Sequence, residues 1–155
     1  LRMLSYLEIW IIGLGLKKYI SMRNEMENFI RDYSITNYND DYKLKVDLSY
    51  KYDVRNDKVW RKWIGRLKKY LNNNDIFLDG FVVSEYDVNM KSLHNHLLIY
   101  SDVDYYKVES KIFNYWKNIG SLRIEKYNRD LNYSSYLCKH LNKSNNNNWE
   151  FLSLL

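Results

Sequence analysis

The chain lacks residues on which several classes of protein depend. Its 155 residues include one cysteine and no proline. The single cysteine, Cys138, excludes an intrachain disulfide framework and a cysteine-rich zinc site. We therefore expect an intracellular protein, in the host cytoplasm if it is viral. Alanine and glutamine are absent while asparagine, lysine, tyrosine and isoleucine are abundant, a bias that favours an AT-rich replicon such as a virus or plasmid.

Long apolar segments are scarce as well. The most apolar run, Tyr6–Leu16, contains Glu8 and two glycines, and it is too short to cross a bilayer. It also lacks the small-residue cleavage site of a signal peptide. We expect no membrane association and interpret the run as part of an N-terminal helical extension, residues 1–34, through which a homodimer could form.

What the chain does contain is typical of a globular, basic domain. A hydrophobic fraction of 46% supplies a core, and the length predicts one domain over residues 1–155. The net charge of +5 favours an anionic partner, and nucleic acid is the first candidate.

Hydrophobic periodicity predicts the order β-α-β-β-α-β. Alternating and apolar runs predict strands, and helical spacing predicts the helices between them. The expected strands are residues 42–50, 76–87, 92–100 and 121–127, and the expected helices are residues 57–71 and 104–120. This order predicts an α+β, ferredoxin-like fold: a four-stranded antiparallel sheet with both helices on one face. A helix over residues 130–143 and the N-terminal helix are additions to this core, residues 42–143.

Two of the three histidines lie at strand spacing. His94 and His96 are two residues apart, which places both imidazoles on one face of a sheet. If the short hairpin pairs Asp87 with Ser92, then Glu85 faces His94 and the three side chains converge on the helix-free face. Two imidazoles and a carboxylate form a common site for a divalent metal. The alternatives are that the histidines only decorate an exposed face, or that a one-residue slip turns Glu85 away.

A second group of polar residues follows near the C-terminus. On a helix, Tyr136, Lys139 and His140 share one face. A cation beside the phenol would favour the phenolate, and a metal would polarise a scissile phosphate. The spacing leaves open whether Tyr136 attacks or an activated water does so. With water, Glu85 would be a metal ligand or general base and Tyr136 would be dispensable.

Together these motifs resemble the HUH endonucleases, specifically the rolling-circle replication initiator (Rep) proteins. KVDLSY is similar to their first-strand motif, SEYDVNMKSLHNHLLIY to their Glu strand and His-x-His strand, and YLCKHLNK to their Tyr-x-x-Lys helix. The resemblance covers about residues 43–143, and length and composition are also similar to a small nuclease of an archaeal filamentous virus.

The resemblance implies a role for each of these residues. Glu85, His94 and His96 would bind Mg²⁺ or Mn²⁺. Tyr136 would attack DNA and leave a 5′-phosphotyrosine and a free 3′-hydroxyl, with assistance from Lys139.

Two residues depart from the family pattern. Asn95 lies between the histidines, where the family usually has a bulky apolar residue. Because we expect Asn95 to face the helices, its amide needs a hydrogen-bond partner. His140 follows the Tyr-x-x-Lys motif, where the family often has tyrosine. Both departures are compatible with a diverged member in which the tyrosine step is altered or lost.

Basic residues and aromatic residues suggest how nucleic acid is bound. We expect phosphate contacts from four residues: Lys45, Arg123, Lys126 and His140. A third reading is a non-catalytic module that binds nucleic acid as RNA-recognition domains do, with Tyr50 and Tyr100 stacking on bases. Glu85 argues against it, because an acid at the sheet centre repels phosphate unless a cation is bound there.

Overall fold

The computed structural model describes residues 15–87, 92–141 and 148–155. One antiparallel sheet has the strand order β4-β1-β3-β2-β5. The strands are β1 (Leu44–Ser49), β2 (Asp79–Asp87), β3 (Ser92–Tyr100), β4 (Leu122–Lys126) and β5 (Trp149–Phe151). The helices are α2 (Gly15–Tyr38), α3 (Asp57–Asn73), α4 (Tyr105–Trp116) and α5 (Tyr133–Lys139), with short 3₁₀ turns at Arg129–Leu131 and Leu152–Leu154. No helix in these residues is long and apolar enough to cross a membrane.

The α+β class is confirmed, and the number of strands is corrected. The chain order from β1 to β4, with α3 and α4 between them, is the expected β-α-β-β-α-β order. The expected four-stranded sheet is wrong, because β5 adds a fifth strand beside β2. The three residues of β5 are too few to show strand periodicity, but pairing with Phe81 buries Phe151 completely.

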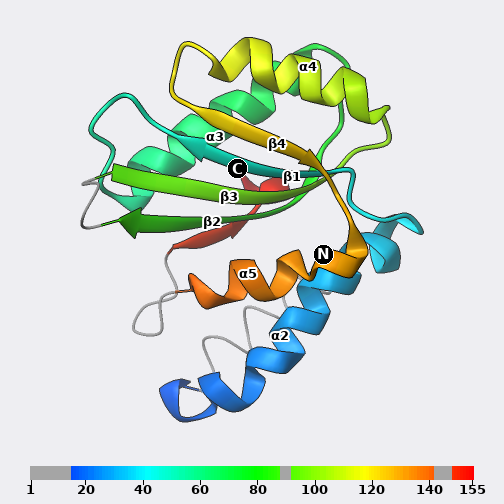
Figure 1. Cartoon of the computed structure of the whole chain (residues 1–155), viewed down its shortest axis with the longest axis vertical. Coiled ribbons are helices and arrows are strands. Elements are labelled where there is room, and N and C mark those ends of the chain that lie inside the picture. Colours follow the sequence, from blue (N-terminus) through cyan, green and yellow to red (C-terminus); the bar gives the residue numbers. More distant parts are fainter. Residues whose placement is uncertain (1–14, 88–91, 142–147) are drawn as a thin grey trace.

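The expectation of a helix-free sheet face is also wrong. Figure 1 shows α3 and α4 on one side of the sheet and α2 and α5 on the other. On the second face, Phe81, Val83 and Leu98 are buried in an apolar cluster to which α2 and α5 also contribute. These sheet side chains need a cover, because leaving them in water costs about 1.5–3 kcal/mol each. The polar residues of the same face lie beside this cluster.

A buried carboxylate joins α2 to the sheet. The phenol of Tyr33 donates a hydrogen bond of 2.8 Å to Asp79 at the start of β2, and Tyr38 donates to the same oxygen. The polar break expected at residues 35–41 therefore begins late, because α2 continues to Tyr38. Residues 1–14, which contain most of the apolar run interpreted as a dimer arm, lie outside the described residues.

The expected register of the central hairpin is confirmed. Asp87 pairs with Ser92, and Glu85 pairs with His94. On the other side of β3, Asp47 of β1 pairs with His96. Paired residues point to the same face of a sheet. Strands β1, β2 and β3 therefore bring polar side chains together on the face that α5 partly covers.

Close approach of β2 and β3 predicts the effect of one substitution. Gly80 has φ +138°, and a Cβ there would lie 1.9 Å from the carbonyl oxygen of Leu98. We expect Gly80→Ala to lower the free energy of unfolding by about 2–4 kcal/mol. Urea unfolding would measure this change.

Gly65 in α3 is the matched control. A Cβ there would meet only an ordinary contact at 3.9 Å, and alanine favours a helix interior over glycine by about 1 kcal/mol. Gly65→Ala should therefore leave stability unchanged or raise it. Equal effects of the two substitutions would contradict the described strand geometry.

Candidate metal centre

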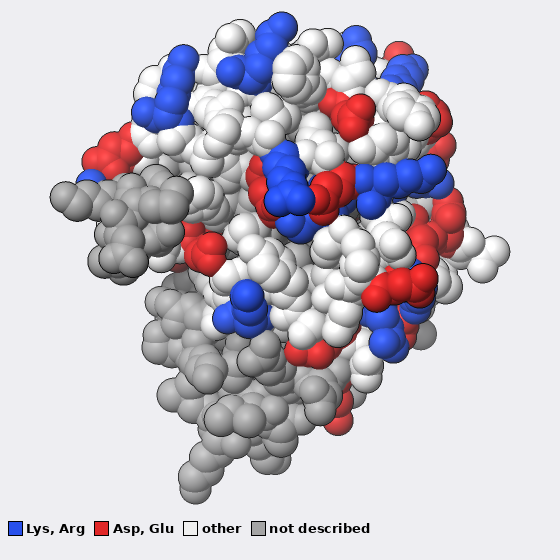
Figure 2. Space-filling model, in the orientation of Figure 1, with Lys and Arg blue, Asp and Glu red and all other residues white. Residues whose placement is uncertain are grey.

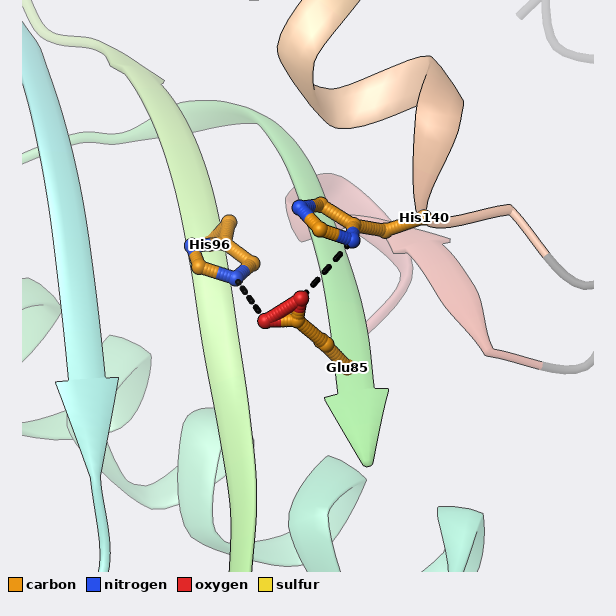
Figure 3. Close-up of side chains that lie close together, drawn as sticks. All are labelled: Glu85, His96 and His140. Atoms are coloured by element: carbon orange, nitrogen blue, oxygen red, sulfur yellow. Dashed lines mark hydrogen bonds and ion pairs between the residues drawn. The ribbon is translucent and has the colours of Figure 1, made fainter. Parts of the chain in front are cut away.

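A carboxylate and two imidazoles meet where β2, β3 and the end of α5 come together. Figure 3 shows Glu85 pointing between His96 and His140. One carboxylate oxygen lies 3.4 Å from His96 Nε2, and the other lies 2.9 Å from His140 Nδ1. One ligand atom from each residue lies within 4.8 Å of the other two. Oxygen and imidazole nitrogen are suitable ligands for a divalent transition-type metal.

Asp47 of β1 orients the histidine at the centre of the sheet. His96 is buried, and its Nδ1 lies 2.6 Å from an Asp47 carboxylate oxygen. Burial raises the pKa of Asp47, but hydrogen bonds from His96 and Lys45 outweigh this and hold the pKa below its usual value. The charged Asp47 accepts a hydrogen bond from Nδ1–H, which leaves the Nε2 lone pair directed at Glu85. Carboxylate–histidine–metal arrangements use this same pairing.

His140 reaches the group from the residue that follows α5. Its ring stacks on that of His96 at 4.9 Å, with an angle of 14° between the planes. Burial lowers the pKa of His140, and the neighbouring His96 and Lys139 lower it further, while Glu85 acts in the opposite direction. A neutral imidazole has a lone pair available for a metal ion.

His94 shares the face of the group without belonging to it. It is half-buried and lies opposite Glu85 on β2 and opposite Ser49 on β1. Among the described residues, the set of three close ligand atoms consists of Glu85, His96 and His140. The structure thus brings together two of the three residues expected as metal ligands, and adds His140, which was expected to contact nucleic acid.

Tyr136 lies against the two histidines. Its ring is 5.2 Å from the ring of His96 and 4.9 Å from that of His140, nearly perpendicular to both. The ammonium groups of Lys45 and Lys139 lie 5.1 and 4.7 Å from its ring centroid. Burial raises the pKa of Tyr136, as do the nearby carboxylates Asp47 and Glu85. The phenol is consequently protonated unless a further cation stabilises its anion.

The basic residues expected to contact phosphate are distributed over both faces. Lys45 lies on the face of the group and is buried, with an ion pair to Asp47. Arg123 pairs with Asp47 in the β1–β4 ladder and has a largely exposed side chain. Lys126 pairs with Leu44, so it lies on the opposite face, where its ammonium approaches the ring of Tyr105 on α4. The structure thus places Lys45 and Arg123, but not Lys126, on the face of the group.

Asn95 has the partner that its position requires. It is completely buried on the face covered by α3 and α4, and Tyr50 donates a 2.5 Å hydrogen bond to its side-chain oxygen. Its amide nitrogen has no partner among the described residues. The polar residue between the histidines therefore faces away from the candidate metal centre.

A cleft of about 600 Å³ opens beside the group. Its lining includes Glu85, Lys139 and His140 on one side and Arg55 and Tyr86 on another. Lys, Arg, Asp and Glu side chains are interspersed on the molecular face seen in Figure 2, with no broad field of one sign. On this face, an anionic ligand would find local rather than continuous basic contacts.

Two residues of the site were missed by sequence reasoning. Asp47 was assigned only to the polar face of its strand, and a signal for its role was the alternation in β1 together with antiparallel pairing to β3. His140 was placed on the tyrosine's helix face but not among the metal ligands. No local pattern could assign it there, because α5 and β2 meet only in the tertiary structure.

The fold and site define an α+β protein with a candidate metal centre beside a tyrosine-bearing helix. The family model described as Replication-associated protein ORF2 matches residues 43–145. This range contains every residue of the group, and the chain belongs to that family. No curated protein and no solved structure gives a significant match. A replication-associated, Rep-like role follows from the family.

The environment of His140 predicts its titration in metal-free protein. Since burial lowers its pKa, the folded protein binds fewer protons than the unfolded chain just below pH 6.5. This contribution to stability is present above the unfolded pKa and is lost as the pH falls through the folded pKa. Replacing Glu85 by glutamine should lower the pKa further, because the carboxylate raises it.

An NMR titration of the imidazole resonances in the presence of EDTA would measure both effects. Glu109→Gln on α4 is the control and should leave His140 unchanged. A pKa at or above 6.5, or a rise in Glu85→Gln, would contradict the described surroundings of His140.

Proposed function

We propose that this protein is a metal-dependent DNA endonuclease of the Rep-like, HUH type, with Tyr136 as its nucleophile. The main support is the position of the Tyr136 ring, about 5 Å from two imidazoles that share one carboxylate. Membership of a replication-associated family supports DNA as the substrate. The cleft beside the group offers space for part of a DNA strand.

The residues present fit a divalent ion such as Mn²⁺ or Mg²⁺. Glu85 and His96 would bind it, and a second histidine, either His94 or His140, would complete the set. The ion would supply positive charge that stabilises a scissile phosphate and lowers the cost of a tyrosine anion. Two imidazole ligands favour Mn²⁺ over Mg²⁺, which prefers oxygen.

The chain's own residues would position the nucleophile. Attack forms a bond from Tyr136 Oη to phosphorus and breaks the bond from phosphorus to the 3′ oxygen. The phenol loses one proton to solvent and the departing 3′ oxygen takes one up, so the products are a 5′-phosphotyrosine and a 3′-hydroxyl. Lys45 and Lys139, whose ammonium groups lie near the Tyr136 ring, would offset the negative charge.

A second candidate uses an activated water in place of Tyr136. The observation that favours it is the raised pKa of Tyr136, which opposes formation of the phenolate. In this version Glu85 would be essential as a ligand or general base, and no protein–DNA bond would form.

The non-catalytic reading has little support. Its two proposed stacking residues, Tyr50 and Tyr100, are 6% and 8% exposed. Tyr50 is bonded to Asn95, and Tyr100 is stacked on Tyr38 at 4.1 Å. Neither ring offers a face on which a base could stack.

Cleavage of circular single-stranded DNA and of supercoiled duplex DNA tests the proposal. With Mn²⁺ or Mg²⁺ we expect nicking that EDTA abolishes, and a covalent protein–DNA adduct on denaturing gels. Tyr136→Phe should remove the adduct and reduce cleavage by about a hundredfold or more, because the nucleophile is lost. Glu85→Gln should reduce cleavage comparably.

Tyr106→Phe is the control, since Tyr106 is exposed on α4 at the other side of the sheet. It should cleave as the wild type does. Cleavage that survives Tyr136→Phe but not Glu85→Gln would replace the tyrosine mechanism by the water mechanism. Absence of cleavage by the wild type with either metal would exclude both.

A further inference from the structure

The candidate metal centre is assembled from two parts of the fold that have no covalent connection nearby. Glu85 and His96 belong to adjacent strands of the sheet, whereas His140 immediately follows the helix that contains Tyr136. Any ion bound by all three residues would therefore join the sheet to α5.

The spacing of the three side chains suits an ion. Ligands about 2.1 Å from a metal lie about 3.0–3.4 Å apart at octahedral to tetrahedral angles. The two Glu85 oxygens are 3.4 Å from His96 Nε2 and 2.9 Å from His140 Nδ1. The atoms that contact one another in the protein are thus already spaced as ligands of one metal would be.

The surroundings of His140 also suit a ligand. Its side chain is only 12% exposed, and Nδ1 faces the Glu85 carboxylate. The other ring nitrogen, Nε2, is buried and has no hydrogen-bond partner among the described residues. A histidine with this environment is not serving as an ordinary solvated cap at the end of a helix.

Helix α5 has reason to need such a link. It spans seven residues, a length at which an isolated helix is unstable in water. Leu137, Cys138 and Leu141 bury its apolar side against α2 and the sheet. The polar side, with Tyr136 and His140, is the one that a metal would fix.

We propose that a divalent ion bound by Glu85, His96 and His140, rather than by the pair His94 and His96, ties α5 to the sheet and thereby positions Tyr136. The inference rests on the proposed metal-dependent function and specifies how its metal is held. His140 lies one helical turn after Tyr136, so a bond at His140 restricts the nucleophile directly. Tyr136 is then in place only when the ion is bound.

Calorimetry with MnCl₂ alone, without DNA, tests the ligand set. We expect His140→Gln to weaken Mn²⁺ binding at least about tenfold, and His94→Gln to change it by less than about threefold. Glutamine keeps a polar side chain at each position, and thermal unfolding in EDTA would show whether each variant folds as the wild type does. Greater loss in His94→Gln than in His140→Gln would overturn the assignment.

Hydrogen exchange followed by mass spectrometry tests the link to α5. Mn²⁺ should slow amide exchange in Tyr133–Lys139 severalfold in the wild type and in His94→Gln, but not in His140→Gln. The amides of α4 serve as the internal control and should not respond. Metal binding that leaves exchange in α5 unchanged would also overturn the inference.

These outcomes separate the inference from the proposed nuclease. Mn²⁺ binding with protection of α5, but no DNA cleavage, would support the metal link and reject the nuclease. Metal-dependent DNA cleavage with full activity and affinity in His140→Gln would do the reverse.

Discussion

The register of the β2–β3 hairpin is the constraint on which the site depends. Side chains alternate between the faces of a strand, so a shift of one residue would move Glu85 to the face covered by α3 and α4. The observed pairing of Glu85 with His94 keeps the carboxylate on the same face as both strand histidines. The same alternation buries Asn95 on the opposite face, where Tyr50 satisfies its oxygen.

Around that hairpin, charge is arranged so that each polar group supports the next. Lys45 and His96 both contact Asp47, which keeps that carboxylate ionised in a partly buried position. Asp47 in turn sets the orientation of His96 toward Glu85. Buried groups of this kind are tolerated only when they are paired. The arrangement favours a neutral His140 and a protonated Tyr136 in the absence of a metal.

The second apolar layer explains why this polar cluster lies under a helix. Face residues such as Phe81 and Leu98 require a cover, and α2 and α5 supply it. Asp79 holds α2 in place through two tyrosines, and α2 packs against α5. Tyr136 and His140 consequently reach the sheet from a helix that is positioned by packing rather than by its own stability. The expectation of an open face overlooked this, because it considered the strand histidines without the apolar residues that share their side.

Sequence alone determined the features that depend on short-range periodicity. Alternation and helical spacing predicted β1 to β4, α3, α4 and the order in which they follow, and the short loop predicted the pairing of Glu85 with His94. The β5 strand, the cover over the second face and the approach of His140 to Glu85 were decided only in the tertiary structure. Each of these joins residues far apart in the chain, and such contacts are selected by the burial of apolar surface in the whole domain rather than by local pattern. The candidate residues could thus be identified from the sequence, while their neighbours in space could not.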